Sequence, residues 1–267
     1  MKSRPFRLAP SFREKVWGAT ALGPWFQSSS SKVGEVWFTT QENPILVKFI
    51  FTSERLSVQV HPDDAYALRH EASPGKTEMW HILRAEEGAR IALGLRETIT
   101  RERLRQASLS GDIEGLLAWF AVQPGDTYFV PAGTVHAIDP GIALVEIQQN
   151  SDITYRLYDY GRPRELHLEK ALAVAHLGPH PGRSVPAGNL LASCDYFVTE
   201  KLGLSEAINF RPDPERSHLL VVLKGSGTLA EQLFRPGEVW LIPAGAEPFS
   251  LQARGGAELL RTYVPRR

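Results

Sequence analysis

Cysteine is almost absent from this sequence. Cys194 is the only one in 267 residues, which excludes an intramolecular disulfide framework and a cysteine-rich zinc site. An excess of charge of one sign is absent too, because 30 Lys and Arg residues balance 30 Asp and Glu residues. Proteins that bind the nucleic-acid backbone carry a clear surplus of Lys and Arg, so we expect no nucleic-acid partner.

Long apolar runs are also missing. No stretch approaches the ~20 consecutive apolar residues of a membrane span. The first residues carry scattered charges in place of the apolar core of a signal peptide. We therefore expect no membrane partner and a cytoplasmic location. The remaining composition, with 43% hydrophobic and 22% charged residues, is that of a globular protein and excludes intrinsic disorder.

Short β-type runs separated by Gly and Pro dominate the chain. Such runs, rich in β-branched and aromatic residues, predict strands at 33–39, 45–51, 56–60, 79–84, 127–130, 143–148, 196–202, 218–224, 239–242 and 259–264. Apolar residues recur at helical spacing in 99–120 and 165–177, which predicts two helical segments there. The Pro- and Gly-rich stretch 178–188 has the composition of a linker. The fold class predicted is mainly β, as a sandwich or barrel.

Two segments of the chain resemble each other. QPGDTYFVPAG at 123–133 and RPGEVWLIPAG at 235–245 share P-G, an acidic residue, an aromatic residue two positions later and P-A-G. Such a repeat predicts two related β modules, the first carrying the helical insertion. The first copy continues to His136, whereas the second has Pro248 in that place. Proline cannot ligate a metal, so a metal site of this type is expected only in the first module.

Candidate metal ligands accompany the first copy. Gln59 and His61 lie two residues apart on a predicted strand and therefore on the same face. Together with Glu78 and His136 they could converge on one divalent cation. Imidazole and carboxylate ligands suit Zn²⁺, although Fe²⁺ or Mn²⁺ would also fit. The remaining histidines lack a partnered motif and are interpreted as structural or surface groups: His70, His81, His167, His176, His180 and His218.

These motifs resemble known families at two levels. The spacing Gly125-x5-Pro131-x-Gly133-x2-His136 is similar to the second signature of the cupin barrel. More specifically, the first 170 residues resemble the short bacterial form of the type I mannose-6-phosphate isomerase family. The matching segments are KVWG at 15–18, GEVW at 34–37, LSVQVHPDD at 56–64, GKTEMW at 75–80, PAGTVHAI at 131–138 and EIQQNSDITYR at 146–156.

The resemblance implies a fold and an activity. It implies two cupin-like (jelly-roll) β-barrel modules: a catalytic module at 1–178, with its helical insertion at about 97–120, and a degenerate module at 179–267. The activity implied is a zinc-dependent interconversion of mannose 6-phosphate and fructose 6-phosphate through a cis-enediol(ate), with a small-molecule sugar phosphate as partner and one Zn²⁺ per chain. Nothing in the sequence indicates the oligomeric state.

Site residues are implied in the same way. The zinc ligands of the family carry over onto His61, Glu78 and His136, with Gln59 as the fourth ligand found in part of the family. Its catalytic arginine falls on Arg156. Its active-site lysine and glutamate fall on the two residues Lys76 and Glu146.

Isomerisation chemistry gives these residues candidate roles. Moving a proton between neighbouring carbons needs a base, an oxyanion stabiliser and a phosphate anchor. Glu146 is the candidate base, with an inward carboxylate that orients another group as the alternative. Arg156 could clamp the phosphate or stabilise the enediolate. Further phosphate-binding candidates are Ser57, Lys76 and Arg162, and for Arg162 a solvated surface charge is the alternative. Trp17 and Trp80 either flank the sugar or pack in the core.

Two other functions are compatible with a cupin barrel. A second class of metal-dependent cupin enzyme, such as a dioxygenase, typically uses a His-x-His pair, and Gln59 in place of the first histidine disfavours it. A sugar-phosphate-sensing cupin without catalysis would be expected to lose its metal ligands. The first module keeps them, which favours the isomerase.

Overall fold

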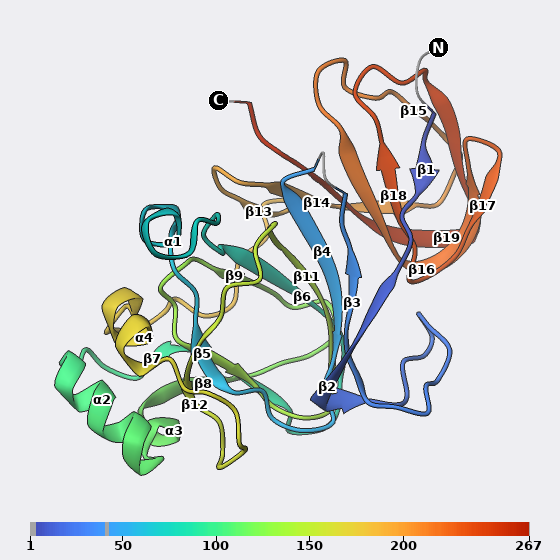
Figure 1. The fold of residues 1–267 in the computed structure, drawn as a ribbon. Coiled ribbons are helices and arrows are strands. Elements are labelled where there is room, and N and C mark those ends of the chain that lie inside the picture. Colours follow the sequence, from blue (N-terminus) through green and yellow to red (C-terminus); the bar gives the residue numbers. More distant parts are fainter. Residues whose placement is uncertain (1–3, 41–42, 267) are drawn as a thin grey trace.

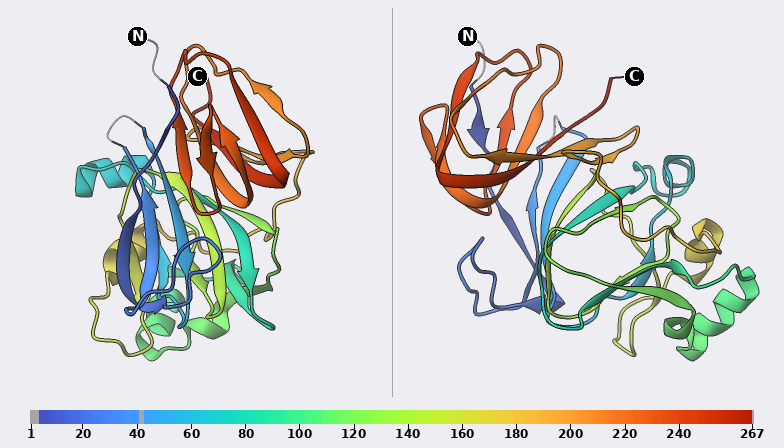
Figure 2. Two further views of the ribbon diagram at one scale, coloured as in Figure 1. Left: turned by 90° about the vertical axis from the view of Figure 1, so that its right-hand side faces the viewer. Right: turned by 180° about the vertical axis from the view of Figure 1, so that it is seen from behind.

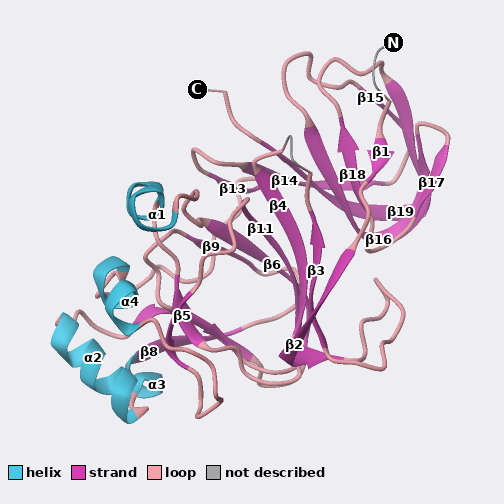
Figure 3. Cartoon of the chain, in the orientation of Figure 1, coloured by secondary structure: helices cyan, strands magenta, loops and turns pink. Residues whose placement is uncertain are grey.

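The computed structural model describes residues 4–40 and 43–266, and these are mainly strands with few helices, as predicted. Figure 1 shows the strands gathered into two lobes, with the C-terminal part of the chain forming the upper one. The helices gather on the far side of the other lobe (Figure 3). None of the helices in the described ranges is both long and apolar enough to cross a membrane.

A six-stranded antiparallel sheet forms the middle layer. In sheet order, its strands are β2 (Ser11–Ala19), β3 (Val33–Phe38), β4 (Ile45–Phe51), β11 (Ile142–Gln149), β6 (Glu78–Ala85) and β9 (Thr127–Val130). Every residue of β4 and β11 is buried, because this sheet is covered on both faces. Side chains alternate across a strand. One face of these two strands is therefore apolar, and the other face points toward the five-stranded sheet of the same lobe.

A five-stranded sheet faces this middle layer. Its strands in order are β12 (Tyr155–Tyr158), β5 (Val58–Val60), β10 (His136–Ile138), β7 (Arg90–Leu95) and β8 (Leu117–Ala121). Side chains from both sheets, among them Ile50, Trp80 and Ile91, form one apolar cluster between them. We call these two sheets the N-terminal barrel. Its outer face is covered by α2 (Arg101–Ser110), α3 (Ile113–Leu116) and α4 (Leu168–Val174), with α1 (Asp64–Glu71) nearby.

The third sheet contains eight strands, and we call it the C-terminal β unit. Its path is β1 (Phe6–Arg7), β18 (Val239–Ile242), β16 (His218–Leu229), β19 (Phe249–Tyr263), β14 (Val198–Leu204) and β13 (Leu190–Ser193); β15 (Ile208–Phe210) pairs with β19, and β17 (Gln232–Phe234) pairs with β16. The N-terminal strand β1 therefore lies in this sheet, where it pairs with β18 from the other end of the sequence (Figures 1 and 2). An apolar cluster shared with the middle sheet, including Phe49, Phe197 and Leu219, joins the two lobes.

Strand order and register recur in the two lobes. The middle sheet contains β3-β4-β11-β6-β9, and the C-terminal β unit contains β13-β14-β19-β16-β18. Lys48 pairs with Glu146 and Glu146 with Trp80 in the first lobe, just as Glu200 pairs with Arg261 and Arg261 with Leu220 in the second. Figure 2 shows the two lobes side by side from behind.

The predicted helices need correction at their ends. The segment 99–120 contains α2 and α3, but its last residues form strand β8, because they pair with β7. The predicted helix at 165–177 is shorter, as α4 spans only Leu168–Val174. Sequence analysis did not predict α1, which buries only Ala67 and therefore shows no apolar periodicity. The predicted linker lies against the barrel, since Ser184 N donates to Thr127 O.

Candidate metal centre

Two neighbouring strands and the start of a third position the predicted metal ligands. His136 begins β10 and lies directly opposite Gln59 on β5. Glu78 begins β6 in the facing sheet, and His61 follows β5. The PAG turn is tied to this group, because Gly133 N donates to His61 O at 2.8 Å. Gly133 has φ +86°, and a Cβ there would lie 2.6 Å from His176, so the turn requires glycine.

The three charged or ionisable ligands converge. One ligand atom from each of His61, Glu78 and His136 lies within 4.8 Å of the others, and all three side chains are buried. The two imidazole Nε2 atoms lie 3.6 Å and 3.8 Å from the Glu78 oxygens. Gln59 joins them, since its Nε2 is 3.1 Å from His136 Nε2. All four predicted ligands are therefore brought together.

Backbone carbonyls orient both histidines. His61 Nδ1 lies 2.7 Å from Ile153 O, and His136 Nδ1 lies 2.9 Å from Thr134 O. A carbonyl only accepts, so each Nδ1 carries the proton and each Nε2 keeps a lone pair. Burial lowers the pKa of His61 well below its usual value and that of His136 to about 4. Both rings are therefore neutral and present Nε2 to the centre, as metal-bound histidines do.

The Glu78 carboxylate is not fully satisfied by protein groups. Its Oε1 is buried and has no hydrogen-bond partner among the described residues. Such a group is costly unless another group satisfies it. Its Oε2 is paired with the Lys76 ammonium, which also lies 2.9 Å from His61 Nε2. Burial, together with the charge of Glu146, raises the pKa of Glu78 to about 7. The orphaned oxygen and the two Nε2 lone pairs are the donor set of a divalent cation.

Glu146 is held as a buried anion between two lysines. Its Oε1 lies 3.2 Å from Lys48 Nζ and 3.6 Å from Lys76 Nζ, and its Oε2 accepts from Trp80 Nε1 at 3.0 Å. Burial alone would raise the pKa of Glu146, but Lys76 and Lys48 outweigh it and lower the pKa. Burial alone would likewise lower the pKa of Lys76, but Glu146 and Glu78 raise it. Both side chains are therefore charged at neutral pH.

A cavity opens beside this centre, lined by Lys15, Trp17, Glu35, Lys48, Ile50, Leu56, Ser57, Gln59, Lys76, Trp80, Ile138, Glu146, Asp152, Thr154, Arg156 and Arg164. Arg156 uses its Nε to donate to Glu165 O at 3.0 Å, and no ion pair in the described ranges engages its guanidinium. Ser57 Oγ lies 3.2 Å from Gln59 Oε1. The lining thus includes three predicted substrate-side groups, Ser57, Lys76 and Arg156, together with Gln59 from the predicted ligands.

Arg162 is not among the lining residues. Its Nη2 pairs with Asp159 at 2.8 Å and donates to Arg55 O, away from the ligand cluster. Arg164 lines the cavity in its stead, with two 2.6 Å hydrogen bonds to Asp159. The structure therefore places Arg162 as a support for the loop that carries Arg164.

Sequence analysis missed several charged lining residues. Lys48 is the clearest, because it is buried in the otherwise apolar strand ILVKFIF, and a lone charge in such a run signals a buried ion pair. Lys15 and Glu35 pair at 3.2 Å at the same cavity. Trp17 and Trp80 are buried and also line the cavity. Each side chain therefore packs in the core and lies at the cavity where a sugar would bind.

The fold and this cluster define a class: a cupin-like β protein whose barrel interior carries a His-Glu-His ligand set. No family model matches the chain. The chain is 33% identical to mannose-6-phosphate isomerase ManA of Bacillus subtilis over 99% of its length and 100% of the relative. The crystal structure of mannose 6-phosphate isomerase from Bacillus subtilis superposes with a TM-score of 0.86 at 31% identity, covering 97% of this chain and 99% of that one. The chain belongs to the mannose-6-phosphate isomerase family.

A more distant neighbour shares the fold. A mannose 6-phosphate isomerase structure described as holo and zinc-bound has a TM-score of 0.76 at 18% identity, covering 99% of this chain and 100% of that one. At this identity the likeness shows the fold alone.

Proposed function

We propose that this protein interconverts mannose 6-phosphate and fructose 6-phosphate, using one divalent metal ion in the N-terminal barrel. The observation that carries the proposal is the orphaned Oε1 of Glu78, which faces two imidazole Nε2 lone pairs beside a charged cavity. Family membership supplies the substrate, because the relatives are named mannose-6-phosphate isomerases.

We propose Zn²⁺ as the ion, held by His61, Glu78 and His136, with the Gln59 amide as a fourth ligand. Two imidazoles and one carboxylate are the ligand set of many catalytic zinc sites, and the zinc-bound fold neighbour agrees with this choice. Bound there, the ion supplies Lewis-acid polarisation of the substrate oxygens. It would also neutralise Glu78, which frees the Lys76 ammonium for the substrate.

The protein residues handle the protons. Glu146, kept ionised by its two lysines, takes the proton from C2 of mannose 6-phosphate and returns it to C1, through a cis-enediol(ate). A proton moves from O2 to O1 in the same conversion, and Lys76 is placed to relay it. Arg156, whose terminal nitrogens engage no carboxylate of the described residues, binds the phosphate or the enediolate oxygen. Ser57 adds a hydroxyl on the substrate side.

We also propose that the chain consists of two related modules, at 1–178 and 179–267. The matched strand orders and the matched residue pairs of the two lobes support this division. Strand β1 does not follow a division of the chain at residue 178, because it belongs to the first module in sequence but pairs with β18 in the second lobe.

The test of the activity is a direct assay. Protein freed of metal with a chelator is mixed with mannose 6-phosphate, and fructose 6-phosphate is measured before and after adding Zn²⁺. We expect no conversion before addition and rapid conversion afterwards. Absence of conversion with zinc present would overturn the proposed activity, and equal conversion in chelator would overturn the metal requirement.

A further inference from the structure

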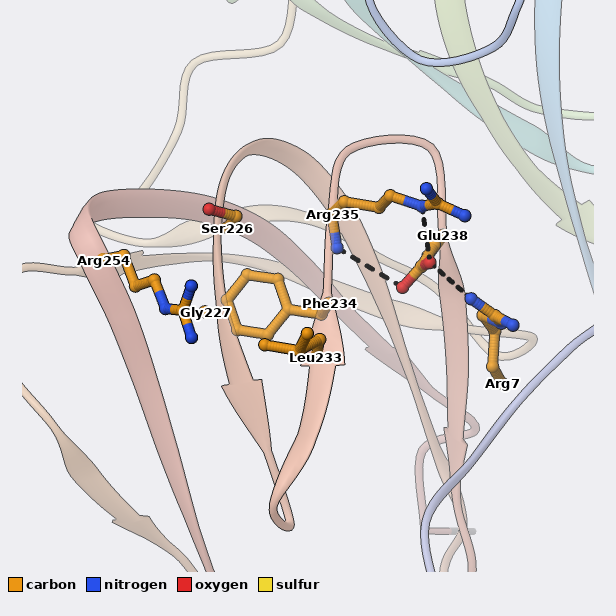
Figure 4. A pocket seen from close by; sticks show the side chains of 8 residues that line it. All are labelled: Arg7, Ser226, Gly227, Leu233, Phe234, Arg235, Glu238 and Arg254. Atoms are coloured by element: carbon orange, nitrogen blue, oxygen red, sulfur yellow. Dashed lines mark hydrogen bonds and ion pairs between the residues drawn. The ribbon is translucent and has the colours of Figure 1, made fainter.

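A second cavity lies in the C-terminal β unit, outside the catalytic barrel. It has a volume of about 370 Å³ and is lined by Arg7, Ser226, Gly227, Leu233, Phe234, Arg235, Glu238 and Arg254 (Figure 4). We call it the arginine pocket. It shares no lining residue with the cavity beside the metal centre.

Positive charge in the arginine pocket exceeds negative charge. Its only acidic lining residue, Glu238, accepts from Arg7 Nη1 at 2.7 Å, from Arg235 Nε at 3.2 Å and from Trp240 Nε1 at 3.1 Å. The Arg235 backbone N–H donates to it as well. With these donors the two oxygens of Glu238 are fully used. The pocket lining therefore contains one carboxylate and three guanidinium groups, two of which contact it.

Arg254 is the uncompensated cation. Its guanidinium forms neither an ion pair nor a hydrogen bond with any residue of the described ranges. Arg7 and Arg235 each give Glu238 only part of their donors, because a guanidinium carries five N–H groups. The arginine pocket therefore offers several free donors and a local positive potential in a chain whose net charge is zero.

The floor between these cations is apolar. Figure 4 shows the Phe234 ring and Leu233 lying between Arg254 on one side and Arg235 and Arg7 on the other. Phe234 is buried, and the backbone of Gly227 makes room for it, since a Cβ there would lie 2.8 Å from the ring. Leu233 is 63% exposed and presents its side chain at the rim.

We propose that the arginine pocket binds a small organic anion, namely a phosphate monoester or carboxylate attached to an apolar body. The oxyanion contacts the Arg254 guanidinium, for which bidentate pairing with phosphate or carboxylate is the preferred geometry. The apolar body covers Leu233 and Phe234. The cavity volume suits such a molecule, since small-molecule pockets are typically about 300–1,000 Å³.

Isothermal titration calorimetry on the full chain tests this site with simple probes. Phenyl phosphate carries both features, inorganic phosphate only the charge, and phenol only the apolar body. We expect phenyl phosphate to bind at least tenfold more tightly than either fragment, and to bind less tightly as salt rises. Benzoate, measured in parallel, identifies whether phosphate or carboxylate is preferred, and tight binding of either supports the proposal.

Arg254→Ala locates the site. We expect it to weaken binding of the preferred probe at least tenfold, while Arg103→Ala, which removes an exposed arginine from helix α2, changes it less than twofold. Isomerase kcat/KM of Arg254→Ala should equal that of the unaltered protein, which verifies folding and separates this site from the catalytic one. Equal binding by Arg254→Ala and the unaltered protein, or no binding of either probe, would overturn the proposal.

Discussion

The two lobes have the same strand register but differ in how deeply the ion pairs at matching positions are buried. In the N-terminal barrel, Lys48 and Glu146 face each other across β4 and β11 with 3% and 5% of their side chains exposed. At the matching positions of the C-terminal β unit, Glu200 and Arg261 form a pair of reversed polarity that is about one-third exposed. Burying an ion pair costs several kcal/mol of desolvation per ion. Of these two matched pairs, Lys48–Glu146, which lines the cavity beside the metal centre, carries that cost.

The two lobes also differ at the position that holds the predicted ligand Glu78 in the N-terminal barrel. Glu78 pairs with Val130 just before the first PAG turn, and His218 pairs with Ile242 just before the second. His218 is buried, and neither of its ring nitrogens forms a hydrogen bond within the part of the chain that the structure describes. Across residues 4–40 and 43–266, the only group of three potential metal-ligating side chains is the one in the N-terminal barrel. Matching positions in the strand pairing thus hold a candidate metal ligand, Glu78, in one lobe and His218 in the other.

The largest expected effect comes from removing His136, whose place in the second repeat is taken by Pro248. His136→Ala leaves two of the three ionisable ligands, and we expect loss of bound zinc together with at least a 1,000-fold fall in kcat, a typical scale for losing charge stabilisation at a reacting oxygen. Metal analysis and the isomerase assay measure both. His218→Ala, which removes a buried histidine of the C-terminal β unit, is the control and should keep both properties. Full activity of His136→Ala with one zinc per chain would refute the ligand assignment.

Arg156→Ala separates metal binding from turnover. The ligands are untouched, so zinc content should stay at one per chain, while kcat/KM falls by about 100-fold because a charge-assisted contact to the substrate is lost. Arg261→Ala, which removes a half-buried arginine of the C-terminal β unit, should change kcat/KM less than twofold. An unchanged kcat/KM for Arg156→Ala would show that this arginine does not contact the reacting substrate.

Stability should respond unequally to breaking the two matched ion pairs. Lys48→Met leaves Glu146 buried with one lysine fewer, and we expect a loss of about 3 kcal/mol in the free energy of unfolding. Arg261→Met breaks the partly exposed pair and should cost about 1 kcal/mol or less. Urea denaturation of both variants measures the difference. Equal losses would mean that burial does not distinguish the two pairs.

Lowering the pH should reduce the free energy of unfolding, and we expect His218 to contribute to this loss. Burial, reinforced by Arg261, lowers the pKa of His218 to about 4 from the usual 6.5, although Asp213 opposes this. Below pH 6.5 the unfolded chain binds a proton on His218, whereas the folded chain binds it only near pH 4. The contribution of His218 to the free energy of unfolding is therefore fully present above pH 6.5 and is lost as the pH falls toward 4. The loss is at most about 3 kcal/mol.

A substitution isolates this contribution. His218→Leu should flatten the fall in the free energy of unfolding between pH 7 and pH 4.5, measured by urea denaturation, whereas His70→Gln, at an exposed position, should leave the fall unchanged. The same pH dependence in His218→Leu and the unaltered protein would assign the acid sensitivity to other groups.

Sequence patterns predicted the local features of this molecule and missed the features made by pairing. Each predicted strand overlaps a strand of the structure, because runs of β-branched and aromatic residues are a local signal, but strands such as β2 and β7 were not predicted. The predicted metal ligands, among them Gln59 and His61, lie close together in the structure. The predicted helical segment includes residues 117–120, although pairing with β7 makes them part of strand β8. Lys48 and Arg164 were missed as lining residues, because only strand register and loop placement bring them to the cavity.

The most direct test of the comparison is a zinc titration of the metal-depleted protein, followed by the isomerase assay at each addition. If only the N-terminal barrel holds a metal ion and that ion supports catalysis, activity rises linearly and stops rising at one zinc per chain. Activity in the metal-free protein, or a rise that continues to two zinc ions per chain, would contradict the assignment of a single metal site to the N-terminal barrel.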